Sequence, residues 1–474
     1  METLTPDICV VGAGAGGLSV AAGAARFRVP VVLIEKSEMG GDCLNAGCVP
    51  SKTLIASAGV AQTMRNAADF GIHATEPRVD WTAVRARIRR TIGTIAPVDS
   101  QARYEAMGVR VIRAPGRFVD DRTIEAGDFT VRARRFVIAT GSSPAAPAIP
   151  GLEFVRSLTN ETIFDLDELP RSLIVLGGGP IGIELGQAFR RLGAEVLVLE
   201  ARTALSREDP ELARVALDRL RREGVEIREG ANVLRIEPHG AGVRVAIAGR
   251  TLEEYVDGSH LLVATGRRPN VEALGLDRAG VRYDRSGIAV DRHLRSVSNG
   301  RVYAVGDVAG REQFTHAASY HAEIVLRRIL FRQRVAERAE RIPRVVYTDP
   351  EIAWTGLSED AARARHRTIH VLRASFSDND RAKTEGVDAG HLKAITARNG
   401  RILGCGIVGP GAGELIAPWT LAIAQGLRAQ DMTSAIAPYP TLSEISRRAA
   451  AEIYAGRIDS AWVRRATAFL RKFG

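Results

Sequence analysis

One pattern constrains the fold of this chain most: a strand, a glycine-rich turn, a helix and a second strand ending in an acid. Its first copy starts with the apolar run Asp7–Val11, passes through a Gly-x-Gly-x-x-Gly turn and a helical stretch to Phe27, and ends with Val31–Ile34 and Glu35. The glycines permit the tight turn and let the backbone approach a pyrophosphate, and the acid can hold a ribose hydroxyl. The residues expected to contact this dinucleotide are Gly12, Gly14, Gly17 and Glu35.

The second copy of the pattern lies in the middle of the chain. Its first strand is Leu173–Leu176, its helix reaches Leu192, and its second strand, Glu195–Leu199, ends in Glu200. Two such folds predict two bound dinucleotides, most simply FAD and a nicotinamide dinucleotide. The residues expected at the second dinucleotide are Gly177, Gly179, Gly182 and Glu200.

Three further apolar strands end in residues of potential function. Segment 301–307 reads as a strand ending in Gly-Asp, which places the Asp307 carboxylate where it could hold a chain of ligand hydroxyls. The runs 136–139 and 261–264 each close on a Thr-Gly pair, whose glycines are Gly141 and Gly266.

Turn-forming residues at 144–151 and 267–270 divide the chain, and they predict crossings into and out of an inserted domain. No phosphate-binding loop follows residue 342, where strands and a helix predict a separate α+β domain. We therefore expect an α/β protein with two Rossmann-like domains and a C-terminal dimerisation domain. The expected bounds are 1–147 and 272–342 for a discontinuous FAD-binding domain, 148–271 for an inserted NAD(P)-binding domain, and 343–474 for the interface domain.

Composition excludes several other classes of protein. The 474 residues suit two or three domains, and 45% hydrophobic with 25% charged residues is typical of a globular protein. The net charge of +10 comes from scattered arginines with no aromatic-interleaved basic stripe, so we do not expect nucleic-acid binding. No apolar run is long enough to span a membrane, and no basic segment precedes the apolar start, so a cytoplasmic protein is expected.

The cysteines point to redox chemistry. Cys43 and Cys48 lie in a run with glycines at 40, 41 and 47 and with Lys52 at its end, and no histidine is near them in sequence. Residues five apart on a regular helix point about 140° apart, so a disulfide between them needs an irregular turn. Lys52 could favour a thiolate. Two buried, reduced cysteines are the alternative, and no metal site is expected.

Together these motifs identify the chain as similar to the class I pyridine nucleotide-disulfide oxidoreductases. These flavin disulfide reductases include dihydrolipoyl dehydrogenase, glutathione reductase and mercuric reductase. The resemblance covers both glycine loops, the Cys-x4-Cys-Val-Pro-Ser-Lys run, the Gly-Asp strand end and the C-terminal domain. It implies a homodimer in which the C-terminal domain completes the partner's active site.

The resemblance also implies a role for each motif residue. Cys48 would be the thiol next to the flavin and Cys43 the thiol that exchanges with substrate, while Lys52 would lie beside the flavin and pair with Glu184. The cofactor contacts that it implies are Gly12, Gly14, Gly17, Glu35, Lys52, Gly141 and Asp307 for FAD, and Gly177, Gly179, Gly182, Glu200 and Gly266 at the nicotinamide dinucleotide.

One position departs from most of the family. Dihydrolipoyl dehydrogenases and glutathione reductases carry a histidine before a proline near the C-terminus, and a glutamate five residues later orients this base. Here Tyr439 takes the histidine position and Glu444 remains. A phenol with a pKa near 10 is a poor base at neutral pH, so efficient dihydrolipoamide oxidation is not expected. Mercuric reductases also have tyrosine there, but this chain lacks their C-terminal cysteine pair.

We therefore predict that electrons pass from NADH through FAD and the cysteine pair to a disulfide, a metal ion or another small acceptor. Glu200 favours the free ribose of NAD and repels the 2′-phosphate of NADP, although Arg202 could soften this preference. An NADH oxidase that reduces quinone or O2 and barely uses its cysteines is an alternative. A redox-sensing flavoprotein that docks through its C-terminal tail is another.

The tail itself has a basic amphipathic pattern. Trp462, Val463, Ala466, Phe469 and Leu470 share a helical face, and most cations lie elsewhere. Such a helix can bind a membrane surface or a partner. Packing on the chain's own interface domain is the expected outcome, and membrane contact is the less favoured one.

Overall fold

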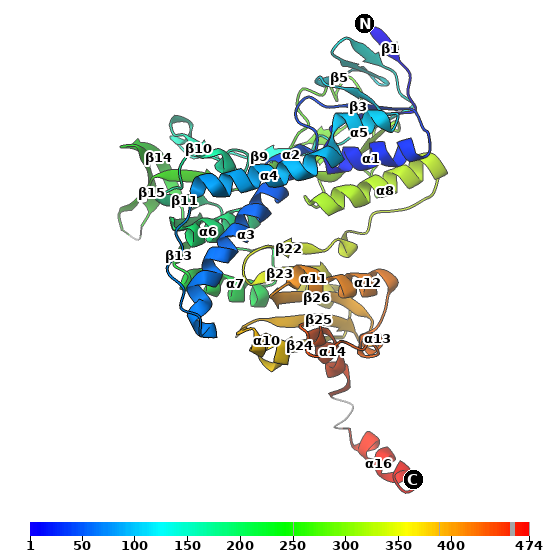
Figure 1. Ribbon diagram of the computed structural model, residues 1–474. Coiled ribbons are helices and arrows are strands. Elements are labelled where there is room, and N and C mark those ends of the chain that lie inside the picture. Colours follow the sequence, from blue (N-terminus) through cyan, green and yellow to red (C-terminus); the bar gives the residue numbers. More distant parts are fainter. Residues whose placement is uncertain (250, 388, 456–459, 474) are drawn as a thin grey trace. The chain divides into compact units, whose positions relative to one another are not determined.

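The computed structural model describes residues 1–249, 251–387, 389–455 and 460–473 (Figure 1). The chain forms two compact units. The first unit comprises residues 1–68, 72–203 and 225–339, and the second comprises 69–71, 204–224 and 340–474.

A five-stranded parallel sheet forms the first dinucleotide fold of the first unit. Its strands, in spatial order, are β21 (Val302–Ala304), β8 (Arg135–Ile138), β2 (Ile8–Val11), β3 (Val31–Ile34) and β4 (Arg110–Ile112). All four residues of β2 are buried, as expected for a parallel strand covered on both faces. The helices α1 (Ala15–Arg26) and α8 (Thr315–Phe331) pack against each other. Because β21 follows the second fold in sequence, the first sheet is built from two separate stretches of the chain.

A second five-stranded parallel sheet forms the inserted fold. Its order is β10 (Ser157–Leu158), β17 (His260–Val263), β11 (Ser172–Leu176), β12 (Glu195–Glu200) and β13 (Val225–Glu229), with α6 (Pro180–Leu192) after β11. The crossings into and out of this fold, β9 (Ser142–Pro144) and β18 (Arg267–Pro269), pair antiparallel with each other.

Two small, mainly antiparallel sheets accompany these folds. One contains β1 (Glu2–Leu4), β7 (Phe129–Val131), β6 (Thr123–Ala126) and β5 (Gly116–Asp120), and in it β1 departs from the antiparallel pattern by pairing parallel with β7. The other contains β14 (Val233–His239), β15 (Gly242–Ala248) and β16 (Glu253–Gly258), all antiparallel. Between β3 and β4 the chain forms α2 (Gly41–Asn45), α3 (Cys48–Arg65), α4 (Trp81–Asp99) and α5 (Gln101–Ala106). Helix α3 packs against α4 and against α6 of the inserted fold, which brings the cysteine segment and the second fold together.

The second unit is an antiparallel sheet with helices, the α+β domain that the sequence predicts. Its strands, in order, are β22 (Arg344–Val346), β23 (Glu351–Gly356), β26 (Ile402–Gly409), β25 (His391–Ala397) and β24 (Ile369–Ser375). Its helices include α9 (Glu359–Arg365) and α10 (Asp380–Thr384) between the strands, and α11 (Ala412–Leu415), α12 (Ala417–Gln425), α13 (Ala429–Thr433) and α14 (Glu444–Ala451) after them. Its core contains Phe376, Ile407 and Trp419.

One helix departs from the predicted domain bounds. Helix α7 (Pro210–Arg222) lies within the range 148–271 expected for the inserted domain, but it belongs to the second unit and packs on β26. The buried Lys393, only 3% exposed, holds it there through Nζ–Oδ2 and Nζ–Oε1 distances of 2.9 Å to Asp209 and 2.8 Å to Glu211. A third carboxylate, Glu359, lies 2.7 Å from the same nitrogen.

The tail forms helix α16 (Ala461–Leu470), and none of its side chains is buried. The packing on the chain's own interface domain that we expected for this helix is therefore not seen. Among the residues that the structure describes, no helix is both long and apolar enough to cross a membrane.

Candidate active site

The first glycine loop connects β2 to α1. Gly12 has φ +106°, and a Cβ atom there would lie 2.4 Å from the carbonyl oxygen of Ala139, so only glycine fits. A Cβ atom on Gly17 would lie 1.9 Å from the Gly12 carbonyl oxygen. Gly14 is the N-cap of α1 and no side chain caps this helix, which leaves its N-terminal N–H groups directed at a ligand. This cradle fits the pyrophosphate of FAD.

Glu35 lies at the end of β3, as predicted, and is only 8% exposed. Its carboxylate accepts hydrogen bonds from the backbone N–H groups of Ala13, at 2.5 Å, and Ser37, at 2.7 Å. Two charge-assisted bonds from the loop fix the carboxylate next to the first turn of α1. This is where the ribose of a dinucleotide would lie.

The second glycine loop repeats this geometry between β11 and α6. Gly177 has φ +105°, and a Cβ atom there would lie 2.5 Å from the carbonyl oxygen of Ala264. Gly182 approaches the Gly177 carbonyl oxygen in the same way, and Gly179 is the N-cap of α6 without a side-chain cap. Glu200 accepts hydrogen bonds from the N–H groups of Gly178, at 2.7 Å, and Arg202, at 2.8 Å.

The two cysteines lie on either side of a break between helices. Cys43 is half-buried within α2, and Cys48 is exposed as the first residue of α3. The segment between the two helices contains the N-cap Gly47, so the irregular turn predicted for this spacing is confirmed. Both thiols are free in the structure.

The environment of the pair makes its two thiols unequal. A hydrogen bond from the Cys43 thiol, helped by Thr315 and by the charge of Lys52, lowers the pKa of Cys48 to about 6 although burial opposes it. The same shared hydrogen bond, together with burial, raises the pKa of Cys43 well above its usual range. The Thr315 hydroxyl lies 3.5 Å from the Cys48 sulfur. Cys48 is therefore the thiolate at neutral pH, and Cys43 holds the proton.

Lys52 and Glu184 join the two folds. The Lys52 Nζ atom lies 2.7 Å from Oε2 of Glu184, whose side chain is 6% exposed, so the predicted pairing is confirmed. Lys52 lies one turn after Cys48 on α3, and Glu184 lies in the first part of α6. The pair thus places a cation beside the thiolate and ties it to the inserted fold.

Sequence reasoning treated Arg267 only as part of a crossing, but the structure places it at the centre of a polar network. Its guanidinium donates to Ser142, with an Nε–Oγ distance of 2.7 Å, and lies 3.1 Å from the carboxylate of Asp42, the residue before Cys43. It also donates to the amide oxygen of Asn160 at 3.3 Å. Its side chain is only 12% exposed.

The network continues to Asp307, which lies in the short 3-10 helix after β21. The Ser142 hydroxyl donates to the Asp307 carboxylate at 2.5 Å. Burial raises the pKa of Asp307, and the Ser142 hydrogen bond and the charge of Arg267 oppose this shift. Gly141 and Gly266 follow β8 and β17 as predicted and border the two crossing strands. The sequence signal that could have identified Arg267 is its place directly after the second Thr-Gly pair.

Tyr439 and Glu444 lie in the second unit. The Tyr439 hydroxyl is exposed and donates to the Asp380 carboxylate at 3.2 Å, a hydrogen bond that raises the pKa of the phenol further. Glu444 begins α14, and its Oε2 atom is buried without a hydrogen bond to any described residue. The two side chains are therefore not joined as a base and its orienting acid.

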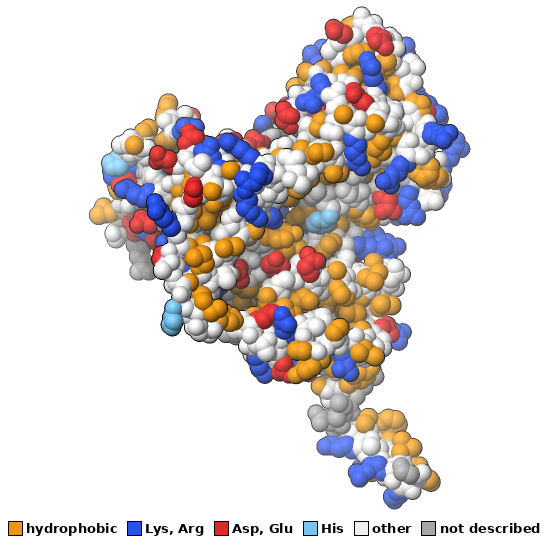
Figure 2. Space-filling model, in the orientation of Figure 1, with side chains coloured by type: hydrophobic (Ala, Val, Ile, Leu, Met, Phe, Trp, Pro, Cys, Tyr) orange, Lys and Arg blue, Asp and Glu red, His pale blue; other side chains and the backbone are white. Residues whose placement is uncertain are grey.

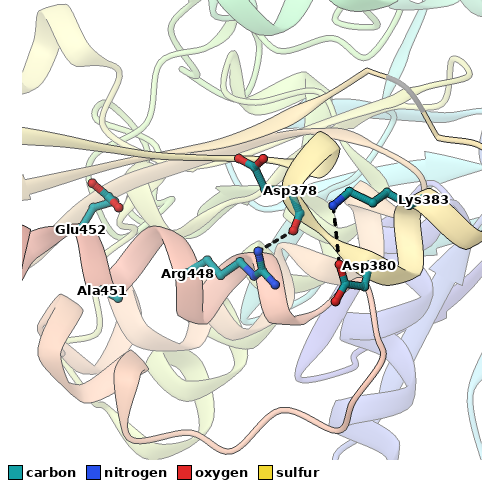
Figure 3. A pocket seen from close by; sticks show the side chains of 6 residues that line it. All are labelled: Asp378, Asp380, Lys383, Arg448, Ala451 and Glu452. Atoms are coloured by element: carbon teal, nitrogen blue, oxygen red, sulfur yellow. Dashed lines mark hydrogen bonds and ion pairs between the residues drawn. The ribbon is translucent and has the colours of Figure 1, made fainter.

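A hollow of about 660 Å³ adjoins Tyr439 through its partner Asp380 (Figure 3). Lys383 points toward Asp380 of the same helix, α10, and Arg448 donates to the backbone carbonyl of Asp378. Its full lining is Asp378, Asp380, Lys383, Arg448, Ala451 and Glu452. The charges on its wall are mixed.

Comparison with known proteins gives matches along most of the chain. Residues 6–322 match the family described as pyridine nucleotide-disulphide oxidoreductase, and residues 342–450 match its dimerisation domain. A mercuric reductase of Streptomyces lividans is 34% identical over 456 residues, which cover 94% of this chain and 95% of that protein. A dihydrolipoyl dehydrogenase of Thermus scotoductus is 35% identical over 452 residues, covering 93% and 95%.

Solved structures give the same picture. LpdA from Mycobacterium tuberculosis superposes with a TM-score of 0.87 at 29% identity, covering 96% of this chain and 100% of that one. The Cu(II) complex of the HOCl-induced flavoprotein disulfide reductase RclA from Escherichia coli gives 0.82 at 27% identity, covering 93% and 98%.

Proposed function

Because the chain belongs to the pyridine nucleotide-disulphide oxidoreductase family, we propose that Cys43 and Cys48 pass electrons from NADH to a small oxidised acceptor. The observation that carries this proposal is the unequal thiol pair, with a Cys48 thiolate beside the Lys52–Glu184 ion pair. FAD, when bound, supplies the two-electron carrier between the nicotinamide and the pair. The residues proposed to hold it are Gly12, Gly14, Gly17, Glu35, Lys52, Gly141 and Asp307.

Cys43 and Cys48 then have different roles in the reaction. Reduction of a Cys43–Cys48 disulfide takes up two electrons and one proton, the equivalent of the hydride that NADH loses, and yields the Cys48 thiolate and the Cys43 thiol. With a disulfide acceptor, Cys43 attacks one sulfur and forms a mixed disulfide, and the other half leaves as a thiol. Cys48 then attacks the Cys43 sulfur, which releases the second thiol and restores the internal disulfide.

The proton on Cys43 limits which acceptors suit this site. Attack by Cys43 requires loss of that proton, and the raised pKa of Cys43 makes this loss unfavourable without a base. Tyr439 stays protonated at neutral pH because its hydroxyl donates to Asp380. We therefore propose that lipoamide is a poor acceptor and that a thiophilic metal ion, as substrate, or a small reactive oxidant is a better one. The relatives named mercuric reductase support this choice.

Several finer assignments complete the proposal. Gly177, Gly179, Gly182, Glu200 and Gly266 hold the nicotinamide dinucleotide, and the Glu200 carboxylate favours NADH over NADPH by repelling a 2′-phosphate. The dimerisation domain supports a homodimer. We propose three domains: 1–147 with 272–342, 148–271 without helix α7, and 343–474 together with α7. We also propose a cytoplasmic enzyme.

Thiol labelling tests the electron path. Anaerobic NADH should make Cys43 and Cys48 alkylatable in the oxidised, FAD-loaded protein, and mass spectrometry should locate both labels. In the Cys48→Ser variant, NADH should no longer increase labelling at position 43. Equal quinone turnover by the wild type and the Cys43→Ser variant, with no NADH-dependent labelling, would instead favour an oxidase that does not use its cysteines.

An acceptor screen tests the reading of Tyr439. NADH consumption is measured with lipoamide, glutathione disulfide, Hg(II), Cu(II) and quinones. We expect low lipoamide turnover, and Tyr439→His should raise it by a factor on the order of 10² because it supplies a general base. Tyr439→Phe serves as the matched control and should leave lipoamide turnover low.

A further inference from the structure

Helix α16 separates its apolar and cationic side chains onto opposite faces. At 100° per residue, the apolar side chains fall within about one third of the helix circumference. They are Trp462, Val463, Ala466, Phe469 and Leu470. The C-cap residue Arg471 keeps helical backbone angles, so the same spacing extends past the helix end. The cations on the opposite side are Arg464, Arg465, Arg471 and Lys472. Figure 2 shows both kinds of side chain on this helix.

The apolar face is open to solvent. Trp462 is 77% exposed, Leu470 66% and Phe473 74%. Burying one such large side chain gains roughly two to four times the transfer free energy of burying a single CH2 group, so burial of this face against a partner is favoured. The charge of the tail decides which cover fits. Residues 460–473 contain four cations and no aspartate or glutamate.

We propose that α16 binds the surface of an anionic lipid bilayer. Its aromatic face would enter the boundary between headgroups and acyl chains, and its cations would lie against lipid phosphates. A helix of 10 residues is about 15 Å long, too short to span the hydrocarbon core, so it lies in the plane of the surface. A second copy of this helix fits less well, because it carries the same four cations and offers no acidic side chain to pair with them.

One such helix gives weak, reversible binding. A homodimer would present two tails to one membrane, and the second would bind at high effective concentration. The dimer is part of the proposed function, but the binding of α16 does not depend on the redox activity.

Vesicle sedimentation tests the inference with the full-length, FAD-loaded protein. It should sediment with vesicles in which roughly one lipid in three is phosphatidylglycerol, and it should stay in the supernatant with pure phosphatidylcholine. High salt should release it. Arg464→Gln and Arg465→Gln should each weaken the partition coefficient roughly fivefold. Trp462→Ser should weaken it by on the order of tenfold.

Two exposed residues elsewhere provide matched controls. Phe154→Ser removes an aromatic side chain that is 75% exposed, and Arg268→Gln removes an exposed cation; neither should change sedimentation. NADH turnover in solution should be the same in all tail variants. Absence of binding to the anionic vesicles, or equal binding by the wild type and Trp462→Ser, would overturn the inference. A smaller oligomer in Trp462→Ser, with vesicle binding unchanged, would assign the face to a second copy instead.

Discussion

The two dinucleotide folds of this chain share their local chemistry but enclose it differently. In each, the first glycine has the same left-handed backbone, φ +106° at Gly12 and +105° at Gly177, and an acid at the end of the next strand receives two backbone N–H groups. The surroundings of the second glycine differ. A Cβ atom on Gly14 would lie 3.9 Å from the Cα atom of Gly41, in the cysteine segment, whereas Gly179 has nothing within 4 Å of its own Cβ position.

This difference teaches how one loop design can serve a resident and an exchanging ligand. Glu35 is buried and the cysteine segment closes over Gly14, so the first loop is walled in. Glu200 is partly exposed and its loop is open. Affinity from the loop itself should be alike, because the same N–H groups and helix end are present in both. The dissociation rate of each ligand should then depend on how far its loop is enclosed.

Alanine at the first glycine of each loop should have the largest effect, and the two variants should show whether the loops bind different ligands. Gly12→Ala forces a Cβ atom into the Ala139 carbonyl at a left-handed φ, so we expect loss of bound FAD and about 3 kcal/mol of stability. Gly177→Ala makes the same clash with Ala264. It should keep FAD and lose most NADH turnover.

The ratio of flavin to protein absorbance and the thermal unfolding midpoint measure both variants. Gly71→Ala is a control for a left-handed glycine with nothing within 4 Å, away from either loop. If Gly177→Ala lost FAD as readily as Gly12→Ala, the two loops would not serve different ligands.

Substitution of the acids Glu35 and Glu200 should have the next largest effect, and each substitution should affect a different ligand. Glu35→Gln should speed FAD release on dilution, because the carboxylate that receives Ala13 and Ser37 N–H groups is lost. Glu200→Gln should raise the KM for NADH roughly tenfold while FAD stays bound. It should also reduce the preference of the enzyme for NADH over NADPH. Steady-state kinetics with both nucleotides measures this. An unchanged NADH to NADPH ratio would count against the role given to Glu200.

The ion pair that joins the folds predicts a pH effect. The lowered pKa of Cys48 means that its thiolate is present above about pH 6 and is lost as the pH falls below it. Alkylation of the reduced protein at position 48 should therefore be half-maximal near pH 6. Lys52→Met removes a cation that favours the thiolate, so the midpoint should rise by about one pH unit.

Peptide mapping of the alkylated protein reads out this midpoint. Lys383→Met, which removes an exposed lysine of the second unit, is the control and should leave the midpoint unchanged. A midpoint near that of a free thiol in the wild type would contradict the inequality of the two cysteines.

The smallest expected effect is the difference in unfolding free energy between substitutions of Arg267 and Arg268, two neighbouring arginines at the crossing between the folds. Arg267→Gln breaks a shielded contact with Asp42 and hydrogen bonds to Ser142, so we expect a loss of about 2 kcal/mol in unfolding free energy. Arg268→Gln breaks only an exposed pair with Glu272 and should cost less than about 0.5 kcal/mol. Urea unfolding of the two variants compares them. Equal losses would show that the buried network adds nothing.

Much of the first unit could be predicted from sequence because its signals are local. The glycine loops, the terminal acids and the break between Cys43 and Cys48 each depend on residues within one short segment. The Arg267 network could not be read in this way, because its members come from five separate segments that meet only after folding. The placement of α7 was missed for a related reason: an amphipathic helix has the same pattern whichever sheet covers it.

For the candidate site, residue identities were more predictable than their partners. Lys52 and Glu184 pair as the resemblance implied. Tyr439 lies in the second unit, but its hydrogen bond to Asp380 follows from loop geometry that spacing does not reveal. The same is true of the Glu444 oxygen, which has no hydrogen bond to any described residue. The tail pattern was recognised, and only its exposure distinguishes a free helix from a packed one.

The place of α7 bears on how the chain is made. Its apolar side, with Leu212, Leu217 and Leu220 buried, packs on strands that the ribosome produces long after the helix itself. During synthesis the apolar side of α7 stays exposed to solvent until these strands have been made. A nascent chain stalled before residue 340 is therefore prone to aggregate. For the same reason residues 148–271 are a poor unit to exchange between relatives. A graft that also includes residues 340–409 would contain the strands that pack on α7.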